Sequence, residues 1–209
     1  MEDPVSDLVA DLARAARALL GDRPRVLLGL CGAPGSGKST TAAALVAALG
    51  PEAVVVPMDG FHLHDDELRR LGRHDRKGAP DTFDVEGYVA LLARLRDPSR
   101  IVYAPVFDRD AEVALAEALA VQPEHRLVIT EGNYLLLPTS GWAEVRPHLD
   151  ACWFLTGDDD VRRSRLVARH VRHGRTPEEA RAWVVRSDEA NAALVATTGP
   201  YADRVVTLG

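Results

Sequence analysis

The chain has 209 residues, of which 46% are hydrophobic and 27% are charged, and its formal net charge is −6 at pH 7. These values are typical of one soluble globular domain with a full-sized core, which we expect to span residues 1–209. The negative charge argues against a general nucleic-acid binder and against docking on anionic membranes. No apolar run approaches the ~20 residues that span a bilayer, and Met1–Pro4 lacks the basic region of a secretory signal. We therefore expect a cytoplasmic protein.

The predicted elements alternate between helices and strands. In chain order we expect helix 5–19, strand 26–30, helix 38–49, strand 51–57, a polar loop-rich stretch 61–84 with a short helix at 65–71, and helix 85–95. The second half is expected to contain strand 101–103, helix 111–120, strands 126–130 and 151–155, helices 158–173 and 176–195, and strand 204–208. This alternation predicts a three-layer α/β fold with a mostly parallel sheet flanked by helices. Ligands of such sheets bind beyond the carboxyl ends of the strands.

Cysteines and lysines are rare in this chain. Cys31 and Cys152 lie in apolar strand-like runs, and we interpret them as buried thiols rather than a disulfide framework. Of the 25 basic residues only Lys38 and Lys77 are lysines. Lys38 belongs to the motif described next. Lys77 therefore merits attention, because ammonium and guanidinium groups differ in geometry and hydration, although chance explains its position equally well.

A glycine-rich motif, Gly32-x-x-x-x-Gly37-Lys38-Ser39, joins the first predicted strand to the following helix. This is the pattern of a phosphate-binding P-loop: glycines let backbone N–H groups surround phosphate oxygens, Lys38 contacts the β- and γ-phosphates, and Ser39 binds Mg²⁺. A chance glycine turn is the alternative, but the strand before and the helix after favour the P-loop. The motif predicts a P-loop nucleoside triphosphatase fold that binds a nucleoside triphosphate together with Mg²⁺. The expected phosphate contacts are Gly32, Ala33, Pro34, Gly35, Ser36, Gly37, Lys38, Ser39 and Thr40.

Two acidic residues follow apolar strands. Asp59 comes directly after the second predicted strand and Glu131 after the strand at 126–130. Asp59 could take the proton from an attacking hydroxyl or help to hold Mg²⁺, and Glu131 has the place of the acid that supports the metal. Each alone could be an exposed strand-end acid. Both together, in a P-loop protein, favour a functional site that contains Ser39, Glu131 and Asp59 around the metal.

A helix with many arginines is predicted near the end of the chain. Residues 160–175 include six arginines. A solvated helix face is one interpretation. The other, which we favour, is a lid over about 158–176, because arginines on a mobile helix can close over ATP and neutralise the transferring phosphoryl group. Arg169 is the strongest candidate for that role. The next helix carries Ser187, Asp188 and Asn191, which could border a ligand or be polar surface residues.

Aromatic residues gather in the polar excursion over about 60–110. Three of the four phenylalanines, Phe61, Phe83 and Phe107, lie there. They could wall a pocket for a polar ligand or anchor the excursion to the sheet. Three histidines occur in the same stretch, at His62, His64 and His74. No cysteine or ordered ligand spacing accompanies them, so we do not interpret them as zinc ligands.

Five segments in a fixed order carry a family resemblance. They are the P-loop, Met58-Asp-Gly-Phe-His62, Arg76-Lys-Gly-Ala-Pro-Asp-Thr-Phe-Asp84, Tyr103-Ala-Pro-Val-Phe-Asp-Arg109 and Thr130-Glu-Gly-Asn-Tyr134. Together they resemble the small-molecule kinases grouped with uridine kinase, phosphoribulokinase and bacterial pantothenate kinase, and are most similar to the fructose transport system kinase-like subgroup. The resemblance implies transfer of the γ-phosphoryl group of ATP to a hydroxyl of a nucleoside, sugar or pantothenate-like metabolite.

The resemblance also implies roles for individual residues. Asp59 matches the catalytic base, and Glu131 matches the acid near Mg²⁺. The catalytic residues that the resemblance implies are Asp59, Lys38 and Arg169. Arg165 and Arg175 match the spacing of the arginines in the lid. The residues assigned to the acceptor are Phe61, His62, Lys77, Phe83, Asp84, Tyr103, Phe107 and Arg109. Because Phe107 replaces the usual tyrosine and His62 follows Asp59 where uridine kinases have an aromatic residue, a uridine-type acceptor is not carried over.

The functional alternatives are a metabolite kinase, an acceptor-independent regulatory or chaperone-type nucleoside triphosphatase, and a silent nucleotide-binding partner protein. The intact set Lys38, Ser39, Asp59 and Glu131 disfavours the last. The expected partner is a small hydroxylated molecule, not nucleic acid or membrane. Oligomeric state stays open, with a homodimer as the assembly that the resemblance suggests.

Overall fold

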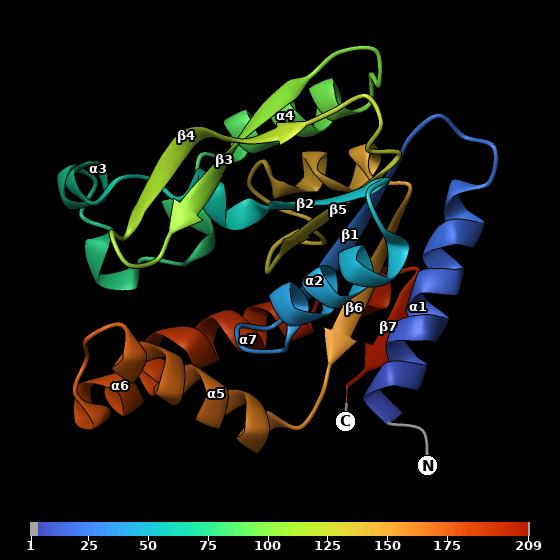
Figure 1. Ribbon diagram of the computed structural model, residues 1–209. Coiled ribbons are helices and arrows are strands. Elements are labelled where there is room, and N and C mark those ends of the chain that lie inside the picture. The colour runs from blue at the N-terminus through green and yellow to red at the C-terminus, as the bar shows by residue number, and fades with distance from the viewer. Residues whose placement is uncertain (1–3, 209) are drawn as a thin grey trace.

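A five-stranded parallel sheet is the centre of the computed structural model, which describes residues 4–208 (Figure 1). Residues 1–3, part of the segment interpreted as lacking a secretory signal, lie outside the described residues. The strands follow the order β2-β5-β1-β6-β7. Their bounds are β1 Val26–Gly32, β2 Ala53–Pro57, β5 Leu127–Gly132, β6 Ala151–Thr156 and β7 Arg204–Thr207. All four strand pairs are parallel, so every carboxyl end lies at one edge of the sheet.

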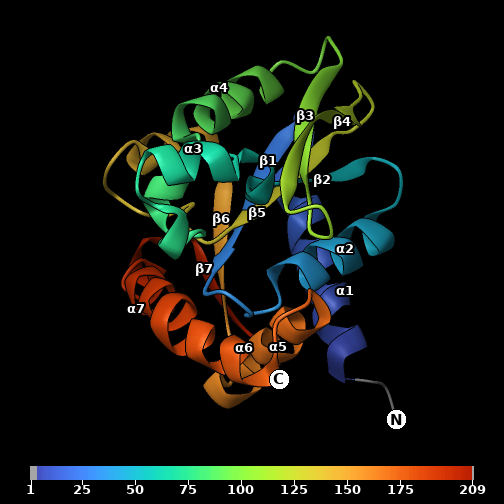
Figure 2. The ribbon, with the colours of Figure 1, turned by 90° about the vertical axis from the view of Figure 1, so that its left-hand side faces the viewer.

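Helices cover both faces of this sheet (Figures 1 and 2). The helices are α1 Pro4–Leu20, α2 Lys38–Leu49, α3 Asp65–Arg70, α4 Val85–Leu95, α5 Asp159–Arg172, α6 Pro177–Trp183 and α7 Glu189–Ala196. One apolar cluster joins α1 and α2 to the sheet. A second joins α4, α7 and the segment 134–149 to the opposite face. The predicted three-layer α/β architecture is confirmed.

The central strands are apolar because both faces of the sheet are covered. All seven residues of β1 are buried, and so are all six of β5. Glu131 is the one charged residue in β1 and β5, and its register opposite Leu30 of β1 and Pro57 of β2 places it at the carboxyl edge. A charged residue at the end of a buried strand is costly unless it has partners, so this edge is where a site is expected.

A buried hydroxyl network fixes strand β2 against β5. Thr130 Oγ1 donates a hydrogen bond to the Val56 carbonyl at 2.7 Å and accepts one from Tyr88 Oη at 2.6 Å. Thr130 and Tyr88 are both fully buried. Thr130 directly precedes Glu131, and Val56 lies three residues before Asp59, so the network sets the relative position of the two acids.

The prediction of a helix over residues 111–120 is wrong. The segment is strand β4, Val113–Val121, which pairs antiparallel with β3, Val102–Asp108, in a separate two-stranded sheet. Its alanine, leucine and glutamate residues are strong helix formers. Pairing along the whole of β3 overrides that preference, and the ladder is interrupted by a bulge between Ala104 and Val106, opposite Glu117 at φ 55°. The brief strand expected at 101–103 is correspondingly longer.

The single helix expected over 176–195 is divided. Helices α6 and α7 are joined by a π-helical turn, Val184–Asp188. Such turns add one residue to the helical repeat, so they change the direction in which the following side chains point. Both cysteines are buried free thiols, as predicted. Between residues 4 and 208 no helix combines the length and the apolar character needed to cross a membrane.

Candidate active site

The P-loop connects β1 to α2 at the carboxyl edge of the sheet. Gly37 has a φ of 91°, a left-handed conformation that favours glycine, and directly precedes the first residue of α2. At the tip of the loop, a Cβ on Gly35 would lie 2.8 Å from Leu166 Cγ and 3.0 Å from the Arg162 carbonyl oxygen. The loop therefore packs tightly under α5, and its glycines leave backbone N–H groups free of side chains, as phosphate binding requires.

The Lys38 side chain folds back onto the start of the P-loop. Its ammonium donates hydrogen bonds to the carbonyl oxygens of Gly32 and Ala33, both at 2.9 Å. Burial lowers the pKa of Lys38, while the charges of Glu131 and Asp59 oppose that shift. Within residues 4–208 both hydrogen bonds of this buried ammonium go to neutral carbonyl oxygens. It can exchange them for phosphate oxygens, which are stronger acceptors for a charged donor. The cradle and its lysine thus fit a nucleoside triphosphate.

Ser39 and Glu131 meet beside the loop. Ser39 Oγ donates a hydrogen bond to Glu131 Oε1 at 2.8 Å. Glu131 is buried, and burial raises its pKa, with the negative charge of Asp59 adding to the shift. Hydroxyl and carboxylate oxygens are the ligands that Mg²⁺ takes together with phosphate oxygens and water. A buried carboxylate with a raised pKa is stabilised by a cation, so the pair fits a Mg²⁺ ion.

Asp59 lies in a 3₁₀ turn, Met58–Phe61, that directly follows β2. Burial would raise its pKa, but the charges of His62, Arg109 and Lys38 outweigh burial and hold the pKa of Asp59 below its ordinary value. Arg109 Nη2 donates to Asp59 Oδ2 at 2.5 Å. Asp59 therefore stays ionised and can accept a proton. The charge of Asp59 acts on Glu131, so the two acids lie near each other at the carboxyl edge of the sheet, where they follow the neighbouring strands β2 and β5.

The ring of His62 packs against two phenylalanine rings. Its ring lies 4.1 Å from the Phe83 ring and 4.7 Å from the Phe107 ring, measured between centroids. Phe83 is buried and makes edge contacts with Tyr134 and Trp142, and Phe61 packs on the same core cluster. Phe61 and Phe83 thus anchor the excursion to the sheet, which was one of the two interpretations of the phenylalanines. Phe107, by contrast, is half-buried beside His62.

The other residues assigned to the acceptor have varied surroundings. Lys77 Nζ is paired with Asp65 at 2.8 Å and Glu112 at 3.0 Å, which ties the excursion to the β3–β4 turn. Asp84 caps α4 by accepting a hydrogen bond from the Gly87 N–H. Tyr103 is 49% exposed and alternates with the buried Val102 and Ala104, so it faces away from the core. Their roles in binding stay predictions.

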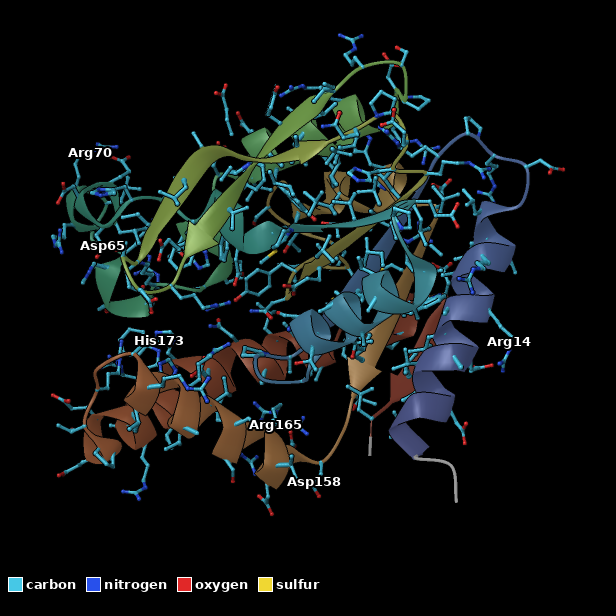
Figure 3. All side chains as sticks on the ribbon, viewed as in Figure 1. Arg14, Asp65, Arg70, Asp158, Arg165 and His173 are labelled. Carbon is cyan, nitrogen blue, oxygen red and sulfur yellow. The ribbon has the colours of Figure 1, made fainter. Side chains whose placement is uncertain are left out.

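The arginines on α5 and directly after it differ in their surroundings. Burial lowers the pKa of Arg169, and the nearby positive charge of Arg109 lowers it further, against the pull of Asp188, Asp59 and Glu131. Arg169 is therefore close enough to the two acids for their charges to act on its guanidinium. Arg165 is exposed and lines a small pocket beside the P-loop (Figure 3). Arg175 stacks on the Trp183 ring at 3.8 Å.

Arg162 is a residue that sequence reasoning did not single out. Its guanidinium is buried, pairs with Asp159 at 2.8 Å and Glu189 at 2.6 Å, and donates to the Pro34 carbonyl of the P-loop at 3.4 Å. It thereby links the first turn of α5 and α7 to the loop. Its only signal in the sequence is the Asp159-x-x-Arg162 spacing, which is typical of an exposed helical pair and gives no hint of burial.

A second group without a clear sequence signal lies at the π-helical turn. Asp188 is buried and pairs with His170 of α5 at 2.8 Å. Asn191 Nδ2 and Tyr134 Oη both donate to the Gly78 carbonyl, at 3.4 Å and 2.5 Å. The interpretation of Asp188 and Asn191 as polar surface residues is wrong, because the turn directs them inward. Asp188 contacts the arginine-rich helix α5 through His170, and Asn191 contacts the excursion through the Gly78 carbonyl.

Comparison of the sequence with known proteins shows a family relationship. The sequence model described as the phosphoribulokinase/uridine kinase family matches residues 27–209. A Schizosaccharomyces pombe protein provisionally named a uridine kinase is 36% identical over 197 residues, covering 88% of this chain and 84% of the relative. The Escherichia coli protein YggC is 33% identical over 204 residues, covering 93% of this chain and 82% of that one.

Solved structures agree. A crystal structure from Silicibacter sp. TM1040, provisionally named a fructose transport system kinase, is 40% identical with a TM-score of 0.87, and the match covers 95% of this chain and 98% of that one. A Bacillus stearothermophilus structure described as a possible uridine kinase matches with a TM-score of 0.68 at 19% identity, over 97% and 99% of the two chains. At that identity the second likeness concerns the fold alone.

Proposed function

The chain belongs to the phosphoribulokinase/uridine kinase family, and we propose that it is an ATP- and Mg²⁺-dependent kinase that phosphorylates a hydroxyl of a small metabolite. The observation that carries the proposal is the convergence of three side-chain groups at one sheet edge: Lys38 in the P-loop, the Ser39–Glu131 pair, and the ionised Asp59. Phosphoryl transfer needs a phosphate cradle, a metal site and a place for the attacking hydroxyl. These groups can supply all three.

On the phosphate side, the loop 32–39 binds the β- and γ-phosphates through its backbone N–H groups and the Lys38 ammonium. Ser39 and Glu131 would hold Mg²⁺, which neutralises charge on the phosphates when bound. Arg169 of α5, which lies near the two acids, stabilises the charge on the transferring phosphoryl group. Arg165, which lines a small pocket together with Gly35 and Ser36 of the loop, covers the nucleotide there.

On the acceptor side, Asp59 accepts the proton of the acceptor hydroxyl. The hydroxyl oxygen then forms a bond to the γ-phosphorus, the bond from that phosphorus to the β–γ bridging oxygen breaks, and ADP leaves. A positioned general base contributes roughly 10²- to 10⁴-fold to such a step. Asp59 suits this role because neighbouring cations keep it ionised near neutral pH.

Relatives suggest which acceptors to test. Similar proteins carry the names uridine kinase, pantothenate kinase and fructose transport system kinase. A nucleoside, a sugar and a hydroxylated acid are therefore the three acceptor classes for a first panel. We infer that the acceptor is a small hydroxylated molecule from one of these classes.

The test measures ATP turnover with and without acceptors. ADP release is followed for the purified protein with Mg²⁺ alone and with uridine, fructose, pantothenate or D-glycerate, and the product is identified by mass spectrometry. We expect slow turnover alone and a stimulation of at least about 100-fold by one acceptor class, as general-base catalysis at Asp59 predicts. The Lys38→Met variant, which removes the loop ammonium, is the inactive control.

Rapid turnover that no acceptor stimulates would overturn the proposal. It would instead favour an acceptor-independent regulatory or chaperone-type nucleoside triphosphatase. A phosphorylated product that forms only with Asp59 intact would support the kinase.

A further inference from the structure

We propose that Arg109 binds an anionic group of the acceptor beside the base Asp59, so that the substrate is a small hydroxylated anion rather than a neutral nucleoside or sugar. This inference rests on the proposed kinase function and deepens it. The geometry that carries it is the contact between the base and a guanidinium that still has free donors. Arg109 Nη2 donates to Asp59 Oδ2 at 2.5 Å.

Most of the hydrogen-bonding capacity of Arg109 is unused. A guanidinium has five N–H donors, and within residues 4–208 the contact to Asp59 is the one hydrogen bond that Arg109 makes to the protein. Its side chain is 41% exposed, and that of Asp59 is 25% exposed. A ligand can therefore reach both groups at once. Guanidinium donors of this kind match carboxylate and phosphate oxygens in geometry.

The local sequence holds Arg109 in place. Asp108, the last residue of β3, accepts hydrogen bonds from the N–H groups of Asp110 and Ala111 at 2.9 and 3.0 Å. This is an Asx-type turn, and it fixes the backbone on both sides of Arg109. The guanidinium is thus presented toward Asp59 by a defined turn.

The other cationic side chains near the proposed acceptor site are paired with carboxylates or lie at the P-loop. Lys77 is 14% exposed and contacts two carboxylates, those of Asp65 and Glu112. Lys38 lies in the P-loop, and Arg169 of α5 is close enough for its charge to act on the Lys38 ammonium. Among the residues that the structure describes, Arg109 is the one arginine or lysine whose side chain forms an ion pair with the Asp59 carboxylate.

The acidic neighbours of Arg109 on the same turn are directed elsewhere. Asp110 lies 3.5 Å from His173 at the end of α5, and Glu112 pairs with Lys77 (Figure 3 shows His173 facing the hairpin). Lys77 forms ion pairs with two carboxylates, whereas Arg109 forms an ion pair with one. An incoming anion therefore adds a second charge partner to Arg109 without displacing Asp59.

This arrangement defines the shape of the acceptor. Asp59 Oδ2 holds Arg109, and within the described residues Oδ1 makes no hydrogen bond, so Oδ1 can take the proton of a hydroxyl. The attacking hydroxyl and the anionic group of the acceptor must then be near each other, as in a short hydroxy acid or a hydroxylated phosphate monoester. During transfer the hydroxyl proton passes to Asp59, the hydroxyl oxygen binds the γ-phosphorus, ADP leaves, and the anion stays on Arg109.

The experiment compares neutral acceptors with anionic partners in which one hydroxymethyl group is replaced by a carboxylate or carries a phosphate. The matched sets are glycerol, D-glycerate and glycerol 3-phosphate; panthenol and pantothenate; and fructose and fructose 6-phosphate. The readout is kcat/KM for ATP-dependent phosphorylation of each compound. We expect an anionic member to exceed its neutral partner by about 10- to 100-fold, the range of a hydrogen bond to a charged group. The carboxylate and phosphate arms show which anion is preferred.

Variants test whether Arg109 causes this preference. Arg109→Met should collapse the ratio of kcat/KM between anionic and neutral partners to near 1, mainly through KM of the acceptor, with KM of ATP unchanged. Arg109→Lys keeps the charge but loses the planar fork, so it should retain part of the ratio. Arg100→Met is the matched control, because Arg100 is exposed and pairs with Asp97 away from the site.

The ratio of kcat/KM between anionic and neutral acceptors does not change if a substitution lowers the activity toward both acceptors by the same factor. If Arg109 only braces Asp59, Arg109→Met lowers kcat for anionic and neutral acceptors alike and leaves the ratio unchanged, which overturns the inference. A neutral acceptor that equals or exceeds its anionic partner in the unmodified protein overturns it as well, while the kinase function stands. If the unmodified protein phosphorylates none of the panel, the inference and the proposed function fall together.

Discussion

Replacing Asp59 by asparagine should separate catalysis from stability. Asparagine keeps the size of the side chain and an oxygen that can accept the hydrogen bond of Arg109, but it cannot take a proton from the acceptor hydroxyl. We expect kcat to fall at least ~10²-fold, the lower range for loss of a general base. That factor corresponds to about 2.7 kcal/mol of transition-state stabilisation.

The structure predicts a much smaller effect on folding. The Asp59–Arg109 pair is short, but its side chains are 25% and 41% exposed, and exposed ion pairs contribute about 1 kcal/mol or less. For a chain of this size such a loss lowers the melting temperature by roughly 2–4 °C. The apparent affinity for ATP should stay equal or rise slightly, because a negative charge near Lys38 is removed while the P-loop is intact.

The assay combines kcat and KM from ADP release with thermal melting of the same preparation. Asp11→Asn is the matched control, since Asp11 on α1 pairs with Arg204 at 2.6 Å and both side chains are partly exposed. The control should keep full activity with a similar change in melting temperature. A kcat within fivefold of the unmodified protein in Asp59→Asn would refute the role of Asp59 as base.

Two further predictions concern the buried groups around the site. Glu131→Gln should raise the melting temperature of the ligand-free protein at pH 7 by roughly 2–4 °C, about 1 kcal/mol, while Mg²⁺-dependent activity is lost. Burial raises the pKa of Glu131 above its ordinary 4.5, so the native protein loses stability relative to the variant as pH rises from about 4 toward 7, and melting curves that differ equally at pH 4 and 7 would contradict this. Thr130→Val should lower the free energy of unfolding in urea by about 1–3 kcal/mol, because the buried Tyr88 hydroxyl loses its acceptor. In the Thr130→Val/Tyr88→Phe double variant the loss should be less than the sum of the two single losses; strict additivity would contradict the network.

Much of the fold could be predicted because its signals are local. The apolar runs at 26–30, 126–130 and 151–155 are buried strands, and the glycine motif between β1 and α2 leaves few alternatives in backbone conformation. The meeting of Asp59 with Glu131 also followed from the sequence, because parallel strands end at one edge.

The parts that could not be predicted depend on contacts between distant segments. Strand β4 has the composition of a helix and becomes a strand only through pairing with β3. Arg162 resembles a surface arginine and is buried because Glu189, 27 residues away, and Pro34, 128 residues away, meet it. The inward direction of Asp188 depends on a π-helical turn, for which the sequence carries no simple pattern.

The composition of strand β4 has a consequence for the dynamics of the site. Because its residues prefer a helix and five central positions are exposed, the β3–β4 hairpin gains little stability from its own sequence and depends on contacts with the rest of the molecule. It should therefore open at a lower free energy than the five-stranded sheet, and its amide protons should exchange with solvent sooner. Arg109 sits on the turn of this hairpin, so an acceptor held between Arg109 and Asp59 would slow exchange along β4, far beyond the residues that it touches.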